Sequence, residues 1–159
     1  MISIGRSMKR RTERIVRMTS ASGTMYMYRG GARRLMIATK MQSVTKAVNA
    51  DALPTGADVI SLVRVVHDHD DAVALGLLRA TPQALPEDGV LLLAEPMSGT
   101  SGAEPIGDAY FGFYLLAMGS GRPRTPERLR TMLASAGFSR SKLLATRRPM
   151  LTRLMLARA

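Results

Sequence analysis

Two polar side chains stand where apolar stretches of the sequence end, and together they suit proton transfer. His67 follows the apolar residues 59–66, and Glu95 follows those at 90–94. If both stretches are parallel strands, their carboxyl ends share the sheet edge where ligands of open α/β sheets bind, about 4.8 Å apart. A carboxylate orients an imidazole and stabilises its protonated form, as a general base requires. The alternative is that Glu95 caps a local backbone group and His67 is a solvated loop residue.

A metal site is a second interpretation of the polar residues 67–71, which read His-Asp-His-Asp-Asp. Consecutive residues at a strand end point in divergent directions, and the helical His-Glu-x-x-His spacing is absent. Asp70 and Asp71 are better explained by the start of a helix, where negative charge is favoured. The spacing therefore predicts no metal ligands here.

The residues around this pair predict the elements that position it. Residues 59–66 and 90–94 are almost continuously apolar, which is typical of strands buried on both faces. Between them, residues 72–85 are rich in alanine and leucine and predict a helix, which Pro82 is expected to bend or shorten. A strand, a helix and a strand in this order form a right-handed crossover unit with parallel strands.

An aromatic stretch follows the second strand. Residues 109–118 are strongly apolar and predict a helix that is too short to span a bilayer. Four aromatic residues gather there: Tyr110, Phe111, Phe113 and Tyr114. They line a hydrophobic substrate pocket or form part of the core, and the pattern does not decide between the two.

The end of the chain predicts one more helix and two strands. Thr125 is a helix cap with Pro126 at the first helical position, and Gly137 is the stop signal. Short strands are expected around residues 142–146 and 151–157, as an antiparallel pair. The whole pattern is that of the second half of an α/β sheet protein.

Basic charge is concentrated at the start of the chain. Residues 1–56 contain 11 lysine or arginine residues and two acidic ones, whereas residues 57–159 contain 12 and ten. The first segment also has two leucines and no phenylalanine, so it is poorly suited to burying a core of its own. We expect residues 1–52 to be a poorly ordered basic leader without a recognisable domain. The alternative, a nucleic-acid-binding arm with residues 9–11 on phosphates, is less favoured.

The composition also excludes several classes of protein. Cysteine is absent, which excludes a disulfide scaffold and thiolate metal sites. No apolar stretch reaches the roughly 20 residues of a membrane helix, and no apolar signal core follows the basic N-terminus. We expect a cytoplasmic protein, with the membrane surface as an alternative location.

Four stretches of the sequence resemble one enzyme family. They are residues 63–71, 91–96, 107–118 and 121–125. Together they are similar to the C-terminal half of S-adenosylmethionine-dependent O-methyltransferases, the family of the plant caffeate and flavonoid enzymes and the bacterial hydroxyindole-type enzymes. The third stretch is most similar to the carotenoid branch, the hydroxyneurosporene (demethylspheroidene) O-methyltransferases of purple photosynthetic bacteria. The resemblance covers residues 53–159, which we expect to be a partial methyltransferase domain.

This resemblance implies a fold and a reaction. The fold would be the C-terminal half of a doubly wound, Rossmann-like sheet. The reaction would transfer a methyl group from S-adenosylmethionine to a hydroxyl of a hydroxylated carotenoid. His67 would be the general base, Glu95 would orient it, and Arg64 would contact the cofactor. The apolar helix at 109–118 suits a polyene substrate.

The sequence also departs from the family. His69 stands where the family usually has tryptophan, and Pro123 stands where the plant members have a second glutamate beside the base. Residues 1–56 contain no glycine-rich cofactor loop, and the adenine-contacting aspartate would fall at residues 46–47, which are lysine and alanine. The N-terminal dimerisation domain of this usually homodimeric family is missing too. We therefore expect a weak or inactive enzyme, with a non-catalytic remnant as the alternative.

The missing first strands have a consequence for the sheet. The strand at 59–66 is expected to have a bare hydrophobic edge, which promotes aggregation or pairing with another chain. The mildly strand-like residues 34–39 are the one candidate in the leader to cover that edge.

Overall fold

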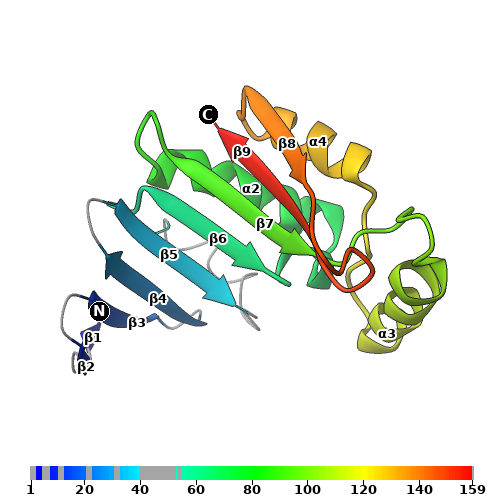
Figure 1. Cartoon of the computed structure of the whole chain (residues 1–159), viewed down its shortest axis with the longest axis horizontal. Coiled ribbons are helices and arrows are strands. Elements are labelled where there is room, and N and C mark those ends of the chain that lie inside the picture. Colours follow the sequence, from blue (N-terminus) through cyan, green and yellow to red (C-terminus); the bar gives the residue numbers. More distant parts are fainter. Residues whose placement is uncertain are drawn as a thin grey trace.

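One sheet runs through the part of the chain that the structure describes (Figure 1). This computed structural model describes residue 53, residues 55–158 and the backbone of five strands among residues 1–52. The early strands are β1 (Ser3–Ile4), β2 (Met8–Arg10), β3 (Glu13–Ser20), β4 (Gly23–Gly30) and β5 (Arg33–Thr39). The later strands are β6 (Val59–Val63), β7 (Val90–Glu95), β8 (Arg140–Leu144) and β9 (Arg153–Arg158). Their order is β1-β3-β4-β5-β6-β7-β9-β8, with β2 paired to β3.

The predicted crossover unit is the centre of this sheet. Strands β6 and β7 pair in parallel, and α2 (Asp71–Ala84) connects them. Helix α2 lies with α4 (Pro126–Ser135) behind the sheet in the view of Figure 1. The side chains between these layers are fully buried, among them Ile60, Leu62, Leu77, Leu78, Leu91, Leu93, Leu129, Leu133 and Met155. The predicted α/β fold is therefore confirmed.

The C-terminal elements also form as predicted. The Thr125 hydroxyl accepts a hydrogen bond from the Arg128 amide at 3.2 Å, so it caps α4, and Pro126 is the first helical residue. Gly137 follows the helix with a φ of 101°, a left-handed conformation that glycine adopts without strain. Strands β8 and β9 pair antiparallel, and β9 also pairs antiparallel with β7.

Strand β6 is shorter than predicted, because the chain turns at Arg64. This residue has a φ of 54°, in the left-handed region that arginine rarely adopts. The Val65 and Val66 amides then donate to Glu95 Oε1 at 3.0 and 2.9 Å instead of continuing the strand. A short 3₁₀ helix, η1 (Val66–Asp68), follows. The predicted extension of the strand to residue 66 is therefore wrong, and His67 lies on a turn.

Helix α2 continues past Pro82 to Ala84, within one residue of the predicted end at residue 85. Proline has no amide hydrogen, so Pro82 cannot donate to the Leu78 carbonyl one turn earlier. The Thr81 hydroxyl donates to that carbonyl at 2.6 Å. The buried carbonyl is thus satisfied, and the helix keeps its last turn.

The edge of β6 is covered, so the prediction of a bare edge is wrong for this chain. Strand β5 pairs with β6 in parallel, from Leu35 opposite Val59 to Thr39 opposite Val63. The strand-like residues 34–39 supply this pairing. The side chains of residues 9–11 lie outside the described residues. Residues 40–52 also lie outside them, so the structure does not test the prediction that the glycine-rich cofactor loop is absent.

The predicted aromatic helix is present and forms two parts. A π-helical segment, η2 (Pro105–Tyr110), leads into α3 (Phe111–Met118), which ends at Gly119 with a φ of 78°. Both lie beyond the carboxyl ends of β6 and β7 (Figure 1). None of the described helices is long and apolar enough to cross a bilayer.

Candidate active site

His67 and Glu95 meet at the carboxyl edge of β6 and β7, as their positions predict. His67 Nδ1 lies 2.6 Å from Glu95 Oε2, and both residues are almost fully buried, at 3% and 1% exposure. The second carboxylate oxygen accepts the two amide hydrogen bonds from Val65 and Val66. Hydrogen bonds to a charged group contribute about 1.5–3 kcal/mol each. Glu95 therefore fixes both the imidazole and the turn that carries it.

A second carboxylate lies on the other side of the same ring. His67 Nε2 is 3.2 Å from Asp68 Oδ1, and the Asp68 side chain is partly exposed. We expected neighbouring residues here to diverge, but the 3₁₀ turn at η1 brings them together. An imidazole that donates Nδ1–H to Glu95 presents Nε2 toward Asp68. This contact was not predicted from the sequence, because only the turn at η1 creates it.

The predicted aromatic residues reach the histidine through Phe111. Its buried ring meets the His67 ring edge-on, with centroids 6.0 Å apart. The Arg64 guanidinium carbon lies 5.1 Å from the Phe111 centroid, a cation–π contact. Tyr110 packs edge-on against Phe111 at 5.3 Å but is mostly exposed, as is Phe113, and Tyr114 is half-buried. Of the four predicted pocket residues, Phe111 is thus the one whose ring contacts His67.

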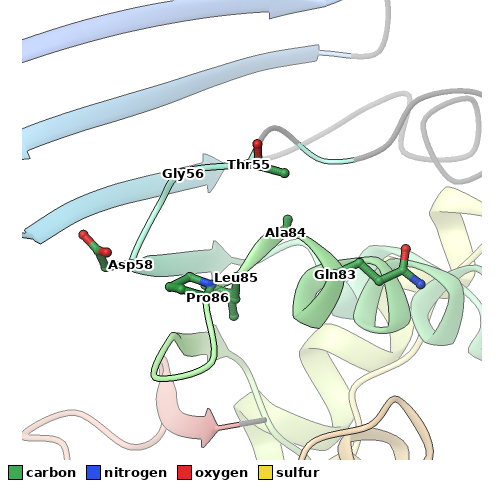
Figure 2. A pocket seen from close by; sticks show the side chains of 7 residues that line it. All are labelled: Thr55, Gly56, Asp58, Gln83, Ala84, Leu85 and Pro86. Atoms are coloured by element: carbon green, nitrogen blue, oxygen red, sulfur yellow. The ribbon is translucent and has the colours of Figure 1, made fainter.

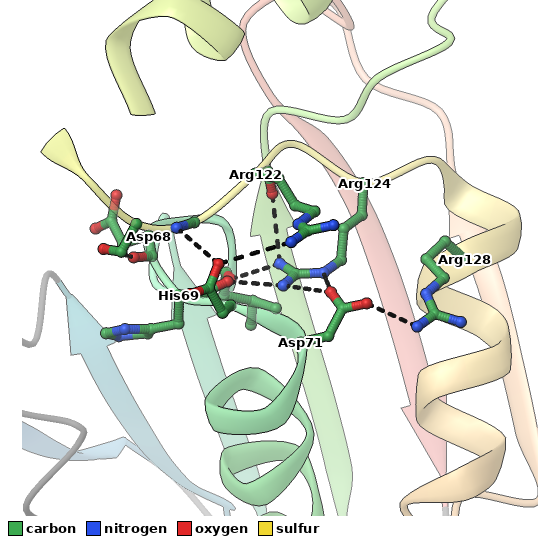
Figure 3. Close-up of polar contacts among 10 residues, drawn as sticks. Asp68, His69, Asp71, Arg122, Arg124 and Arg128 are labelled. Carbon is green, nitrogen blue, oxygen red and sulfur yellow. Dashed lines mark hydrogen bonds and ion pairs between the residues drawn. The ribbon is translucent and has the colours of Figure 1, made fainter. Parts of the chain in front are cut away.

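A buried arginine holds the turn behind His67 (Figure 3). Arg124 donates to the Val66 carbonyl at 2.8 Å, to the His69 carbonyl at 2.7 Å and to Asp71 Oδ1 at 2.9 Å. Arg128 donates to the other oxygen of Asp71 at 2.7 Å. The hydrogen bonds from Arg128 and then Arg124 hold the pKa of Asp71 below its ordinary value, against the opposing effect of burial. Asp71 therefore pairs with two arginines as well as beginning α2.

His69 carries a polar atom that has no partner. Its Nε2 is buried and makes no hydrogen bond in the structure. Burial lowers the pKa of His69, which favours the neutral ring at neutral pH. A neutral imidazole has one nitrogen that donates and one that accepts, so Nε2 is a buried hydrogen-bonding atom without a partner among the described residues.

A separate hollow lies at the opposite end of the crossover unit (Figure 2). It has a volume of about 350 Å³ and is lined by Thr55, Gly56, Asp58, Gln83, Ala84, Leu85 and Pro86. Asp58 is the one ionisable residue in this lining. The hollow is at the amino end of β6, away from His67, so it plays no part in the chemistry of the pair. Among the described residues, no group of three or more acidic or histidine side chains is placed to hold a metal ion.

Comparison with known proteins places this site in a family. The model of the O-methyltransferase domain matches residues 31–139, which include His67 and Glu95. The chain belongs to the O-methyltransferase domain family. The match also includes β5, whose backbone completes the edge of β6.

Two bacterial relatives are similar in sequence over most of the described chain. The demethylspheroidene O-methyltransferase of Rhodobacter capsulatus is 46% identical over 102 residues, which are 64% of this chain and 26% of the relative. The enzyme of the same name from Cereibacter sphaeroides is 42% identical over 99 residues, covering 62% and 26%. This O-methyltransferase chain thus spans about a quarter of the length of these relatives.

Solved structures show the same fold. Human N-acetylserotonin methyltransferase, solved in complex with S-adenosylmethionine, is 26% identical with a TM-score of 0.60, over 70% of this chain and 31% of that one. TnmH is 32% identical with a TM-score of 0.58, over 69% and 32%. Because the human enzyme was solved with S-adenosylmethionine, we ask which described residues of this chain fit that molecule.

The described residues include two groups suited to binding part of S-adenosylmethionine. The unpartnered Nε2 of His69 is a buried polar atom to which a ligand at the carboxyl end of β6 can hydrogen-bond. The exposed Arg64 stands at the end of the same strand. The sequence has no glycine between Gly31 and Gly56, and residues 40–52 lie outside the described residues. The fit therefore rests on His69 and Arg64.

Proposed function

We propose that this chain transfers a methyl group from S-adenosylmethionine to a hydroxyl of a hydroxylated carotenoid, with His67 as general base. The observation that carries the proposal is the buried contact of 2.6 Å between His67 Nδ1 and Glu95 Oε2 in a member of the O-methyltransferase domain family. A ring held in this way is oriented for proton transfer before substrate arrives.

His67 is proposed to take the proton of the substrate hydroxyl on Nε2. The oxygen keeps the electron pair of its O–H bond and forms the new bond to the methyl carbon. When bound, S-adenosylmethionine supplies an electrophilic methyl group on a positively charged sulfur, which retains the electrons of the broken S–C bond. The imidazolium then donates to Glu95 through Nδ1, and the carboxylate stabilises its charge.

Asp68 has to share Nε2 with the substrate. Its Oδ1 is 3.2 Å from Nε2, the nitrogen that is proposed to accept the proton. The side chain is partly exposed, so rotation toward solvent frees Nε2. After proton transfer, Asp68 is placed to accept the new N–H. This supplies a second carboxylate beside the base, in a chain whose Pro123 cannot do so.

The apolar surroundings of the ring support an apolar substrate. Phe111 packs against His67, and Tyr110 extends the aromatic surface outward. The two most similar relatives named above are demethylspheroidene O-methyltransferases, which supports a hydroxylated carotenoid. Arg64 and His69 would hold the methyl donor, through a cation and a hydrogen-bonding ring nitrogen.

Radiolabelled methyl transfer tests the proposal. The full chain is incubated with S-adenosylmethionine labelled on the methyl group and a hydroxylated carotenoid, and label is counted in the organic extract. We expect His67→Gln to lower the rate about 10²- to 10⁴-fold, as loss of a general base does. Glu87→Gln, at an exposed turn before β7, is the matched control and should keep the full rate. Equal rates for His67→Gln and the unaltered chain would contradict the proposal, and a chain that binds no S-adenosylmethionine is a non-catalytic remnant.

A further inference from the structure

We infer that Arg124 is a positioning residue for His67, holding the histidine turn in register with the strand end that carries Glu95. The histidine turn is defined here as residues 66–69, and the strap is the segment 120–124 that crosses it. The inference extends the proposed function, on which its catalytic meaning rests, to a residue remote in sequence from the catalytic pair.

The Arg124 side chain donates hydrogen bonds to the histidine turn on both sides of His67. Its two terminal nitrogens donate to the Val66 carbonyl at 2.8 Å and to the His69 carbonyl at 2.7 Å. Arg124 is 4% exposed, so these hydrogen bonds are shielded from water. A planar guanidinium offers several donors in a fixed fork, which a lysine ammonium cannot reproduce. The guanidinium therefore sets the distance between two carbonyls that flank the catalytic histidine.

The main chain of the same residue is fixed to the strand end beyond Glu95. The Ser98 amide donates to the Arg124 carbonyl at 3.1 Å, and Met97 and Arg124 form a parallel bridge. Met97 is two residues past Glu95 in the chain. Arg124 thus contacts the loop behind each member of the catalytic pair, one with its side chain and the other with its backbone.

Other residues of the strap donate hydrogen bonds to the remaining carbonyls of the histidine turn. The Arg122 amide donates to the His67 carbonyl at 2.9 Å, and the Ser120 hydroxyl donates to the Asp68 carbonyl at 3.2 Å. With the two Arg124 bonds, all four consecutive carbonyls of the histidine turn are bonded by the strap. Gly121 allows this approach, because a Cβ there would lie 2.3 Å from the His67 carbonyl oxygen. The strap therefore acts as a template for the backbone of the turn.

The positive charge of Arg124 is balanced outside the histidine turn. Its guanidinium forms an ion pair with Asp71 at 2.8 Å, and Arg128 shares the same carboxylate. Arg128 is about half exposed, and no hydrogen bond from it to the histidine turn is present. Arg128 is therefore a matched control, since it contacts the same aspartate without holding the turn.

The test compares Arg124→Lys and Arg124→Met with Arg128→Met in the full chain. The first readout is the proton resonance of His67 Nδ1–H in protein with ¹⁵N-labelled histidine, which reports the short bond to Glu95 without any need for turnover. The second is kcat and KM for methyl transfer. We expect the resonance to move or vanish in both Arg124 variants and to persist in Arg128→Met. We expect kcat to fall about 10- to 100-fold with little change in KM, because a misplacement of about 1 Å costs on the order of 10²-fold.

The two readouts separate this inference from the proposed function. A chain without methyl transfer whose resonance still responds to Arg124→Lys would retain the positioning role and lose the proposed function. If Arg124→Met fails to fold, Arg124→Lys decides, since it keeps the charge and most of the stem. A folded Arg124→Lys variant with an unchanged resonance would overturn the inference, and so would an equal change in Arg128→Met.

Discussion

Each polar atom of the Glu95 carboxylate has a specific partner. One oxygen accepts from His67, and the other accepts from the amides of Val65 and Val66. The carboxylate thus has two duties, since it orients the base and also ends strand β6. A change that alters one oxygen and keeps the other separates these duties.

Glu95→Gln is that change. The amide oxygen can still accept from the two valine amides, but the NH₂ group now faces His67 Nδ1 as a donor. The ring must then accept at Nδ1 and carry its proton on Nε2, which cannot take a proton from the substrate. We expect the rate of methyl transfer to fall by a factor of about 10² or more. The change of tautomer should be visible in the ¹⁵N chemical shifts of the His67 ring.

Glu95→Ala is the comparison for stability. It leaves the Val65 and Val66 amides and His67 Nδ1 buried without a partner, at about 1–3 kcal/mol for each unsatisfied group. In urea unfolding, the free energy of unfolding of Glu95→Ala should therefore be well below that of Glu95→Gln. Equal unfolding free energies would show that the carboxylate does not hold the turn.

The contact between His67 and Glu95 was predictable from the sequence, and the other contacts around it were not. His67 and Glu95 each follow an apolar stretch, and parallel strands bring such residues to one edge. Asp68 and Arg124 depend on a backbone turn at Arg64, which no residue preference announces because arginine rarely adopts a positive φ. The signal for the strap was the Gly-Arg-Pro-Arg-Thr motif at residues 121–125, whose glycine and buried arginine have a structural purpose.

At the scale of elements, helices α2 and α4 are joined at their amino ends by charge. Asp71 in the first turn of α2 is bonded to Arg124 just before α4 and to Arg128 within it. The helix boundaries were predictable because caps, proline and glycine mark them in the sequence. The link between the helices was not, since either arginine could equally have been a solvated surface charge.

This link predicts how stability depends on pH. The pKa of Asp71 is lowered from 3.8 by its arginine partners, so the folded protein binds this proton more weakly than the unfolded chain. The contribution is therefore complete above about pH 4 and is lost as the pH falls through the lower folded value. It is at most about 1 kcal/mol, because Asp71 is partly exposed. Asp71→Asn should unfold more easily than the unaltered chain at pH 6, and in denaturant titrations the difference in unfolding free energy should shrink as the pH is lowered below 3.8. A difference that does not shrink in acid would point to packing as its cause.

At the scale of the whole molecule, the described sheet joins two kinds of pairing. From β6 onward the sheet contains the predicted parallel pair β6–β7 and the predicted antiparallel pair β8–β9, whereas β3, β4 and β5 form an antiparallel meander ahead of them. The covering of β6 by β5 was only weakly indicated in the sequence, since a basic, methionine-rich segment is an unusual neighbour for a buried strand. The pairing of β5 with β6 joins residues that are distant in the sequence, and local sequence patterns do not encode such a contact.

Ile37→Pro tests whether β5 protects this edge. Ile37 lies opposite Ser61 in the parallel pair, and proline removes one ladder hydrogen bond and is rare inside sheets. We expect the variant to form larger species in light scattering and to unfold at lower denaturant concentration. Ile37→Val is the control, because it keeps the amide and the β-branched shape. A monomeric Ile37→Pro variant of unchanged stability would show that β5 is not needed.

The strap bonds to main-chain carbonyls of the histidine turn, not to its side chains. Every amino acid presents the same carbonyl, so the shape of the turn is insulated from the identity of the residues that it displays. The side chain at position 69 can therefore change without loss of the backbone geometry at His67, whereas position 121 has no room for any side chain, because a Cβ there would lie 2.3 Å from the His67 carbonyl oxygen.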